Sequence, residues 1–267
     1  MKARHVAAIV LRQIYLLRGS PTRVLPLFAW IAIDILLWGF ITRYLNSVAT
    51  SGFDFVPAML GAVLLWDFLS RVMQGVTMAF FEDVWSRNLM GIFASPLSRA
   101  EYVTGLVLTG ICTSLLGLAV MIVLASFAFG LSFLSYGLAI IPALLVLFLF
   151  GIALGVAGSA MVLRLGPAAE WLIWPLPAVL SPFASVFYPV STLPGWMQPI
   201  SLALPPSYVF ESLRAIATGG QADYAAISLA LCLSIVYVAA AAAFFAHVHR
   251  LCIRNGLIAR YSAESVS

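Results

Sequence analysis

The segment Glu82–Glu101, EDVWSRNLMGIFASPLSRAE, is a charged stretch that lies between two long apolar runs. The chain around it is strongly hydrophobic: 63% of the 267 residues are hydrophobic, only 9% are charged, and the mean hydropathy is +1.06. Soluble domains carry about 25% charged residues, because their surface must be solvated. We therefore expect an integral membrane protein in which Glu82–Glu101 is a solvated loop between two spans.

Six segments are long and apolar enough to cross a bilayer. A spanning helix needs about 20 mainly apolar residues, because its backbone must satisfy its own hydrogen bonds inside lipid. The sequence predicts an all-α membrane fold that forms one domain over residues 1–267, with spans over 24–45, 56–81, 102–130, 138–163, 170–190 and 224–248.

Residues 2–18 form an amphipathic segment ahead of the first span. On a helix its basic residues share one arc and its apolar residues the opposite one: Arg4, Arg12 and Arg18 against Val6, Val10, Ile14 and Leu17. A basic amphipathic helix typically lies in the headgroup plane of a membrane. We predict an interfacial helix here, and an ordinary cytoplasmic tail is the alternative.

The Lys and Arg residues are distributed unevenly between the two sides of these spans. Cytoplasmic loops carry the excess of positive residues. One side has Lys2, Arg4, Arg12, Arg18, Arg23, Arg87, Arg99, Arg164, Arg250, Arg254 and Arg260, and the other has only Arg43 and Arg214. This distribution predicts a multi-pass protein of the plasma membrane with both termini and the Glu82–Glu101 loop in the cytoplasm.

The sequence lacks the motifs of several kinds of chemistry. A phosphate-binding P-loop needs a lysine after its glycines, and the only lysine is Lys2. The histidines His5, His247 and His249 do not have the spacing of a metal site. No basic run with interleaved aromatic residues indicates nucleic-acid binding. We predict no catalytic residue, no metal, no cofactor bound by this chain and no nucleic-acid partner.

Two stretches carry a more specific signal. EDVWSRNLMGIFASPLSRAEYVTG, which begins at Glu82, and VFYPVSTLPGWMQPISLALPPSYVFESLRAI, at Val186–Ile216, resemble the motifs of ABC-2 type exporter permeases. The resemblance implies a homodimer of six-span subunits bound to two copies of a cytoplasmic ABC ATPase subunit, which would bind ATP and Mg. It also implies export of an amphipathic, lipid-like or drug-like substrate from the cytoplasm or inner leaflet, in bacteria across the inner membrane.

In such a permease the loop would contain the coupling helix that contacts the ATPase. We place Glu82 and Asp83 near the start of this helix, where acidic side chains suit the helix dipole, and Pro96 at its end. An apolar face is expected from Trp85, Leu89, Ile92 and Phe93, and Arg87 and Leu97 complete the predicted coupling set. A helix that merely lies at the interface is the alternative.

Polar residues form a stripe along the second span. Asp67, Ser70, Arg71, Gln74 and Thr77 fall within an arc of about 120° on a helix with 3.6 residues per turn. Ionisable groups inside a bilayer normally face protein or water, and the spacing of Asp67 and Arg71 allows them to pair. The stripe is expected to line the substrate path or the dimer cleft, or equally to be an ion pair that locks helix packing. Asp34, in the first span, is a second buried acid that could reach Arg71 or a residue of the second copy in the dimer.

The segment after the fifth span is rich in proline and aromatic residues. Ser191–Asp223 is too interrupted to cross a membrane, so we expect short re-entrant helices. Prolines also break the fifth span. A gate is predicted from Glu170, Pro175, Pro182, Phe187, Tyr188, Trp196, Tyr208, Glu211 and Arg214, with Glu211 and Arg214 as an ion pair. Aromatic anchoring at the interface, and for Glu170 a helix-start carboxylate, are the alternatives.

Small residues Gly151, Gly155 and Ser159 recur at a four-residue spacing in the fourth span, which favours close packing inside the subunit. By family resemblance, spans one and five would form the subunit interface. Two other functions stay open: a secondary transporter or channel without an ATPase, and a membrane scaffold that transports nothing.

Overall fold

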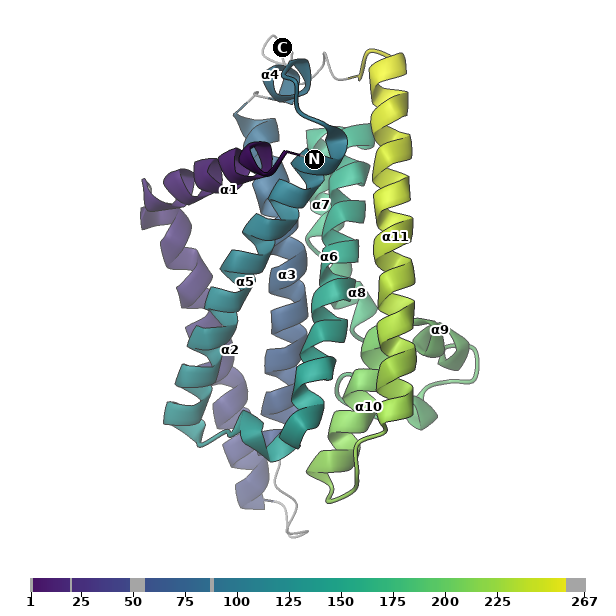
Figure 1. Cartoon of the computed structure of the whole chain (residues 1–267). Helices are drawn as coiled ribbons and strands as arrows, with labels where there is room; N and C mark the ends of the chain where they lie inside the picture. The colour runs from purple at the N-terminus through teal and green to yellow at the C-terminus, as the bar shows by residue number, and fades with distance from the viewer. Residues whose placement is uncertain (1, 20, 49–55, 87–88, 258–267) are drawn as a thin grey trace.

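The computed structural model describes residues 2–19, 21–48, 56–86 and 89–257. Within these ranges every regular element is a helix, as the sequence predicts. Five long helices run side by side (Figure 1): α2 Pro21–Val48, α3 Gly61–Trp85, α5 Arg99–Phe129, α6 Ile140–Leu165 and α11 Tyr224–Arg254. Five stretches are long and apolar enough to cross a membrane: Phe28–Val48, Ala58–Trp85, Arg99–Phe129, Tyr136–Leu165 and Tyr224–Arg254.

The predicted fifth span, residues 170–190, is not one continuous helix. The chain there forms η3 Pro167–Ala169, α7 Glu170–Ile173 and α8 Leu176–Leu180, and only turns and bends follow before η4 Val190–Thr192. The break between α7 and α8 falls at Pro175, which has no amide proton to continue the helix. The expectation that prolines break this segment is confirmed, whereas the described residues contain five helices of spanning length and not six. Helices α7 and α8 still lead from one end of the bundle toward the other (Figure 1).

The two ends of the bundle differ in what they carry. One end, here called the α1 end, holds α1 Ala3–Arg18, α4 Leu89–Ala94 and the last turn of α11. The opposite end, here called the α10 end, holds α9 Gln198–Ala203 and α10 Pro205–Ala217, together with the connection through η2 Phe133–Ala139 (Figure 1).

Helix α1 lies across the bundle rather than along it, and it packs on α5 (Figure 1). Its buried side chains are Val6, Ile9 and Gln13, whereas Arg4 and Arg18 are exposed. Of the predicted apolar arc, Val6 is buried against the chain and Ile14 is exposed, and the polar Gln13 is also buried. Gln13 is buried because its side-chain amide donates to the carbonyl oxygen of Ala79 on α3 at 3.1 Å.

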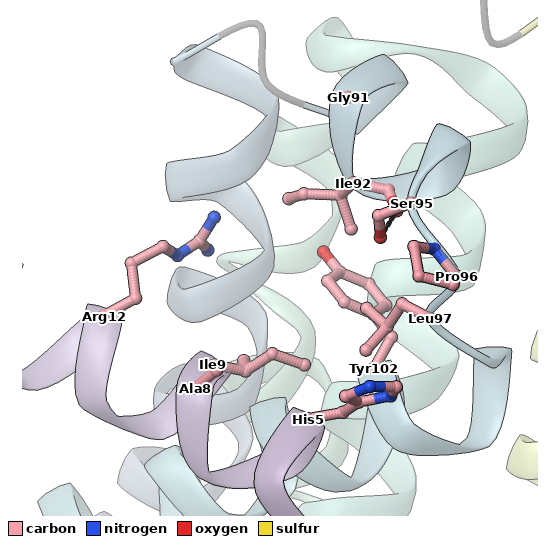
Figure 2. A pocket seen from close by; sticks show the side chains of 10 residues that line it. All are labelled: His5, Ala8, Ile9, Arg12, Gly91, Ile92, Ser95, Pro96, Leu97 and Tyr102. Carbon is pink, nitrogen blue, oxygen red and sulfur yellow. Dashed lines mark hydrogen bonds between the residues drawn. The ribbon is translucent and has the colours of Figure 1, made fainter. Parts of the chain in front are cut away.

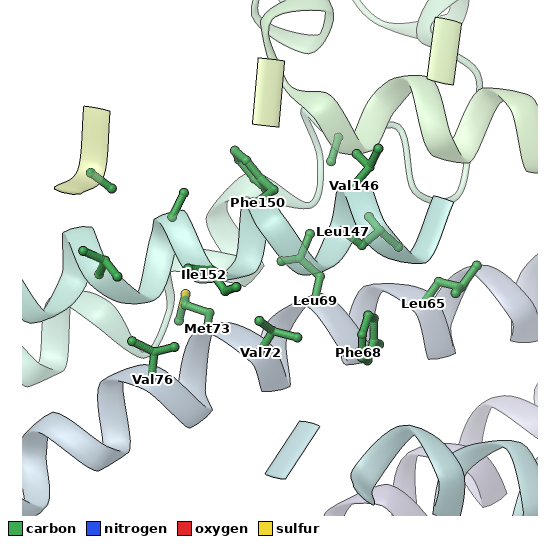
Figure 3. Close-up of a cluster of buried hydrophobic side chains, with 14 of the residues drawn as sticks. Leu65, Phe68, Leu69, Val72, Met73, Val76, Val146, Leu147, Phe150 and Ile152 are labelled. Carbon is green, nitrogen blue, oxygen red and sulfur yellow. The ribbon is translucent and has the colours of Figure 1, made fainter. Parts of the chain in front are cut away.

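Helix α3 occupies the centre and packs against both α5 and α6. Its apolar side chains, among them Leu69 and Val72, face those of α6 such as Leu147 and Phe150 (Figure 3). Apolar side chains packed in this way fill the interior densely, and they carry no polar atoms that need a hydrogen-bond partner.

Glycines bring these helices close together. A Cβ on Gly75 of α3 would lie 2.9 Å from the Cα of Gly110 on α5, so the two backbones meet there. A Cβ on Gly151 of α6 would lie 2.8 Å from Val72 Cβ, and one on Gly155 would lie 2.8 Å from the Met73 carbonyl oxygen. The prediction that Gly151 and Gly155 serve packing within the subunit is confirmed, since both meet α3.

Candidate functional site

One face of α3 is only partly covered by the rest of the chain, and there the side chains of Asp67 and Arg71 are 19% and 12% exposed. Apart from Trp85 at its end, the partly exposed residues of this helix are Trp66, Asp67, Arg71, Gln74, Gly75, Met78 and Glu82. Asp67, Arg71, Gln74, Met78 and Glu82 follow one another at spacings of three or four residues, so they form a single stripe. We call these five residues the open stripe. It runs from the middle of the bundle to the α1 end.

Asp67 and Arg71 form an ion pair on the open stripe. The Arg71 Nε donates to Asp67 Oδ2 at 2.8 Å, across one turn of the helix. Asp34 on α2 is half-buried, and its carboxylate lies near enough to Arg71 for the two charges to interact, without a hydrogen bond or ion pair between them in the described residues. The Arg71 side chain crosses Gly117 of α5, where a Cβ would lie 3.4 Å from Arg71 Cδ. The cluster therefore lies where α2, α3 and α5 meet.

Two residues of the predicted stripe do not belong to the open face. Ser70 and Thr77 are buried, and each hydroxyl donates to a carbonyl of its own helix, at Trp66 and Met73. The 120° arc was too wide to separate the open face from its edge. Met78 and Glu82 were not assigned to the stripe from sequence, although the same spacing of three or four residues extends to them.

At the α1 end, Asp83 joins three helices. It is 1% exposed, it accepts a hydrogen bond from the Tyr102 hydroxyl of α5 at 2.7 Å, and it forms an ion pair with Arg12 of α1. Sequence reasoning missed Arg12 and Tyr102 as partners, because neither has a local motif that points to Asp83. Both residues are far from Asp83 along the chain, so only the folded structure shows that they contact it.

The predicted coupling helix begins later than expected. Glu82, Asp83 and Trp85 belong to the last turns of α3, so they do not start the next helix. That helix is the short α4, whose Leu89 is fully buried and whose Ile92 is partly buried. It ends before the exposed Pro96, as predicted, and Leu97 is partly buried. Arg87 and the side chain of Phe93 lie outside the described residues.

A cavity of about 510 Å³ separates α4 and the turn after it from α1. Apolar side chains line most of it, and His5, Arg12 and Tyr102 contribute polar groups (Figure 2). The turn is held at the start of α5 by a capping box, in which Ser98 Oγ accepts from the Glu101 amide and Glu101 accepts from the Ser98 amide. Glu101 also accepts from the Lys2 amide at 2.6 Å and contacts His5 Nδ1 at 3.1 Å.

At the α10 end, one ion pair holds the segment that follows α8. Arg214 Nη1 lies 3.2 Å from Glu211 Oε2, which confirms the predicted pair. Arg214 also donates to the carbonyl oxygen of Ser185 at 2.6 Å, and Glu211 accepts from the Val190 amide at 2.5 Å. Burial lowers the pKa of Arg214 from its usual value, while the Glu211 carboxylate opposes that change.

The other aromatic residues of the predicted gate each have a separate contact. Phe187 stacks on Trp38 of α2 with ring centroids 5.5 Å apart, and Tyr188 donates to the Pro182 carbonyl oxygen at 2.8 Å. Trp196 is largely exposed, and the Tyr208 hydroxyl donates to the Leu202 carbonyl oxygen.

Glu170, at the start of α7, accepts from Trp174 Nε1 at 3.1 Å. Helix α7 lies nearer the α1 end than α9 and α10 do (Figure 1). The structure thus divides the predicted gate into two separate groups.

The fold and the open stripe define a class: a polytopic helical membrane protein with ionisable groups in its apolar part. Among the described residues, no group of three His, Cys, Asp or Glu side chains could hold a metal ion. The family model of the ABC-2 type transporter matches residues 6–218, so the chain belongs to the ABC-2 type transporter family. Comparison with curated proteins gives no match.

The matched range includes α3, α4 and α10, and therefore both stretches on which the resemblance was based. This family supplies the membrane part of a transporter and not its ATPase domain. The chain is thus the permease component of a transporter.

Proposed function

We propose that this permease is the transmembrane subunit of an ATP-driven exporter that moves an amphipathic substrate out of the cytoplasm or the inner leaflet. In this proposal the α1 end faces the cytoplasm, two ATPase subunits that bind ATP and Mg attach there, and a second copy of the chain completes the transport path. The uneven distribution of Lys and Arg supports this orientation.

The observation that carries the proposal is the continuity of α3. The same helix bears Asp67 and Arg71 near its middle and Asp83 near its end, and α4 follows after a short connection. Because a helix is stiff over this length, a displacement at α4 would reach the open stripe through α3. The ion pair and hydrogen bond of Asp83 would move α1 and α5 together with α3.

The broken segment supports a conformational step in the same cycle. Short helices joined by a few residues can reorient at low cost, whereas a continuous helix cannot. We assign the α7–α8 segment and the outer helices α9 and α10 to the gate that opens when α3 moves. The contribution of this chain is thus a conformational step and not covalent chemistry.

The test is a helix interruption in α3 just before the α1 end. The pair Met78→Gly and Ala79→Gly weakens the helix by about 2 kcal/mol, because each glycine costs about 1 kcal/mol relative to alanine. In a complex purified with its ATPase subunit, we expect ATP hydrolysis to continue and transport of fluorescent amphiphiles in vesicles to fall. Met78→Ala is the control, because it removes the same side chain but keeps the helix.

Two results would contradict the proposal. Transport by the glycine pair at the rate of the Met78→Ala control would show that α3 does not transmit the motion. Transport that continues without ATP, or without any ATPase subunit, would instead indicate a secondary transporter or a channel.

A further inference from the structure

The charges along the open stripe and its neighbour α2 are unbalanced. Two carboxylates, Asp34 and Asp67, accompany one guanidinium, Arg71, among the described residues where α2 and α3 meet. Arg71 is hydrogen-bonded to Asp67. Asp34 makes no hydrogen bond or ion pair within the described part of the chain, and its interaction with Arg71 is electrostatic, without direct contact. The middle of the bundle therefore carries a carboxylate in excess of its cation.

An excess carboxylate at this depth has a cost that a cation would remove. Charged groups in the bilayer core are unfavourable by several kcal/mol unless they are paired or hydrated. A second copy of the chain would bring the same excess at this depth, because Arg71 is the cation there in each copy. Arg43 lies nearer the end of α2, over the Phe129 ring at 5.7 Å from the centroid. Packing between two copies thus does not balance Asp34.

Aromatic side chains lie beside Asp34 on α2. Trp30 is one turn before it and Trp38 one turn after it, and the indole of Trp30 is 62% exposed. Residues four apart on a helix share one face. A carboxylate beside an exposed indole is a favourable environment for an organic cation, because both the negative charge and the face of the ring attract it.

We infer that the substrates of this permease are amphiphiles whose polar group is cationic, and that Asp34 receives this group, with Trp30 as an aromatic wall. The inference rests on the proposed function, since it names the substrate class for the same open face. Asp67 keeps its pairing with Arg71 in this assignment. Gln74 and Met78 follow on the open stripe without opposing charge.

Two lipophilic ions of matched size test the inference: tetraphenylphosphonium, which is cationic, and tetraphenylborate, which is anionic. We would measure their equilibrium binding to the permease in nanodiscs of neutral phosphatidylcholine, after subtraction of binding to empty nanodiscs. The expected result is that the cation binds about tenfold more tightly than the anion, a difference of about 1.4 kcal/mol.

Substitutions at Asp34 show whether this residue carries the preference. Asp34→Asn is expected to weaken binding of tetraphenylphosphonium about tenfold, and Asp34→Glu to retain it. Asp223→Asn is the matched control, because it removes one carboxylate at the far end of the molecule and asparagine still caps α11. The unfolding temperature of each variant shows that it is folded, and the comparison of two ions on the unmodified chain requires no variant.

The outcomes separate this inference from the proposed function. Equal binding of the two ions, tighter binding of the anion, or unchanged cation binding in Asp34→Asn would overturn the inference. In inverted vesicles, ATP-driven transport of other amphiphiles without any preference for cations would overturn it as well, and would leave the exporter intact. Cation binding without ATP-driven transport would support the site and contradict the exporter.

Discussion

Asp83 and Asp67 lie on the same helix but in opposite situations. Asp83 is 1% exposed and has partners on two other helices, Arg12 and Tyr102. Asp67 is paired with Arg71 one turn away on its own helix, on the face that the chain leaves partly open. The contacts of Asp83 join three helices, whereas the ion pair of Asp67 lies within one helix, on its partly exposed face. In the proposed mechanism, α3 would transmit motion at one end and meet the substrate in its middle.

The largest effect on stability is expected for Asp83, at the α1 end. Asp83→Ala leaves the Arg12 charge and the Tyr102 hydroxyl without their acceptor. Breaking a buried ion pair costs roughly 3–5 kcal/mol, and a value at the lower limit is expected because Arg12 is partly exposed and can turn to solvent. The unfolding temperature in detergent measures the effect.

Glu82→Ala is the control for this change, because it removes a neighbouring carboxylate that lies on the open face. An equal loss of stability in both variants would contradict the claim that Asp83 stabilises the fold more than the carboxylates of the open stripe do.

A second prediction concerns the contact that holds α3 against α5. In Gly75→Ala, the added methyl would meet the backbone of Gly110 at 2.9 Å and force the helices apart. Overpacking of this kind costs about 1–3 kcal/mol. Gly117→Ala adds the same methyl to α5 but meets side chains at ordinary contact distances, Arg71 Cδ at 3.4 Å and Ile31 Cδ1 at 3.8 Å. Unfolding temperatures should fall for Gly75→Ala well below those for Gly117→Ala, and the reverse order would contradict the close approach.

A smaller effect is expected at the α10 end. Glu211→Gln removes the ion pair with Arg214, but the new side chain can still accept from the Val190 amide. The Glu211 side chain is 38% exposed, and pairs of this type contribute about 1 kcal/mol or less. Hydrogen exchange of the amides in residues 185–190 should accelerate modestly. Exchange that stays as slow as in the unmodified chain would show that the ion pair does not hold this segment.

The smallest effect on stability is expected at the open stripe itself. Asp67→Leu combined with Arg71→Met removes both members of the pair, and apolar replacement of an ion pair is often neutral or stabilising. We expect the unfolding temperature to change little and transport by the complex with its ATPase subunit to fall. A folded double variant with full transport would favour a packing role for the pair.

Much of the helical layout could be predicted, because long apolar runs in a chain with few charges have few alternatives to spanning helices. The break in the fifth predicted span, 170–190, could be predicted from its prolines, and the structure confirms it at Pro175. Hydropathy indicated a sixth helix of spanning length in the chain, and the described residues contain five. At the start of α4 the error was of another kind: Glu82 and Asp83 look like helix-start residues, but α3 simply continues through them to Trp85.

The candidate site could be predicted only in part. Asp67 and Arg71 were found because their spacing is local, and Asp34 because an acid inside an apolar run is conspicuous. Arg12, Gln13 and Tyr102 could not be assigned partners, since their contacts with α3 depend on how α1 and α5 cross it. Likewise, Ser70 and Thr77 share the polar arc, but only the packing of neighbouring helices shows that they are buried.

The sequence by itself determined the class of environment, the helical periodicity and the pairs that lie within one helix, because these depend on composition and on spacings of three or four residues. Only the tertiary structure decided which face of α3 stays open and which acid is joined to other helices. The physical reason is that burial and ion pairing depend on the positions of α1, α2, α5 and α6 around α3, and no local pattern encodes those positions. The segment Glu82–Glu101 thus begins in the last turn of α3 and continues into the short α4. The end of α3 is held by α1 and α5.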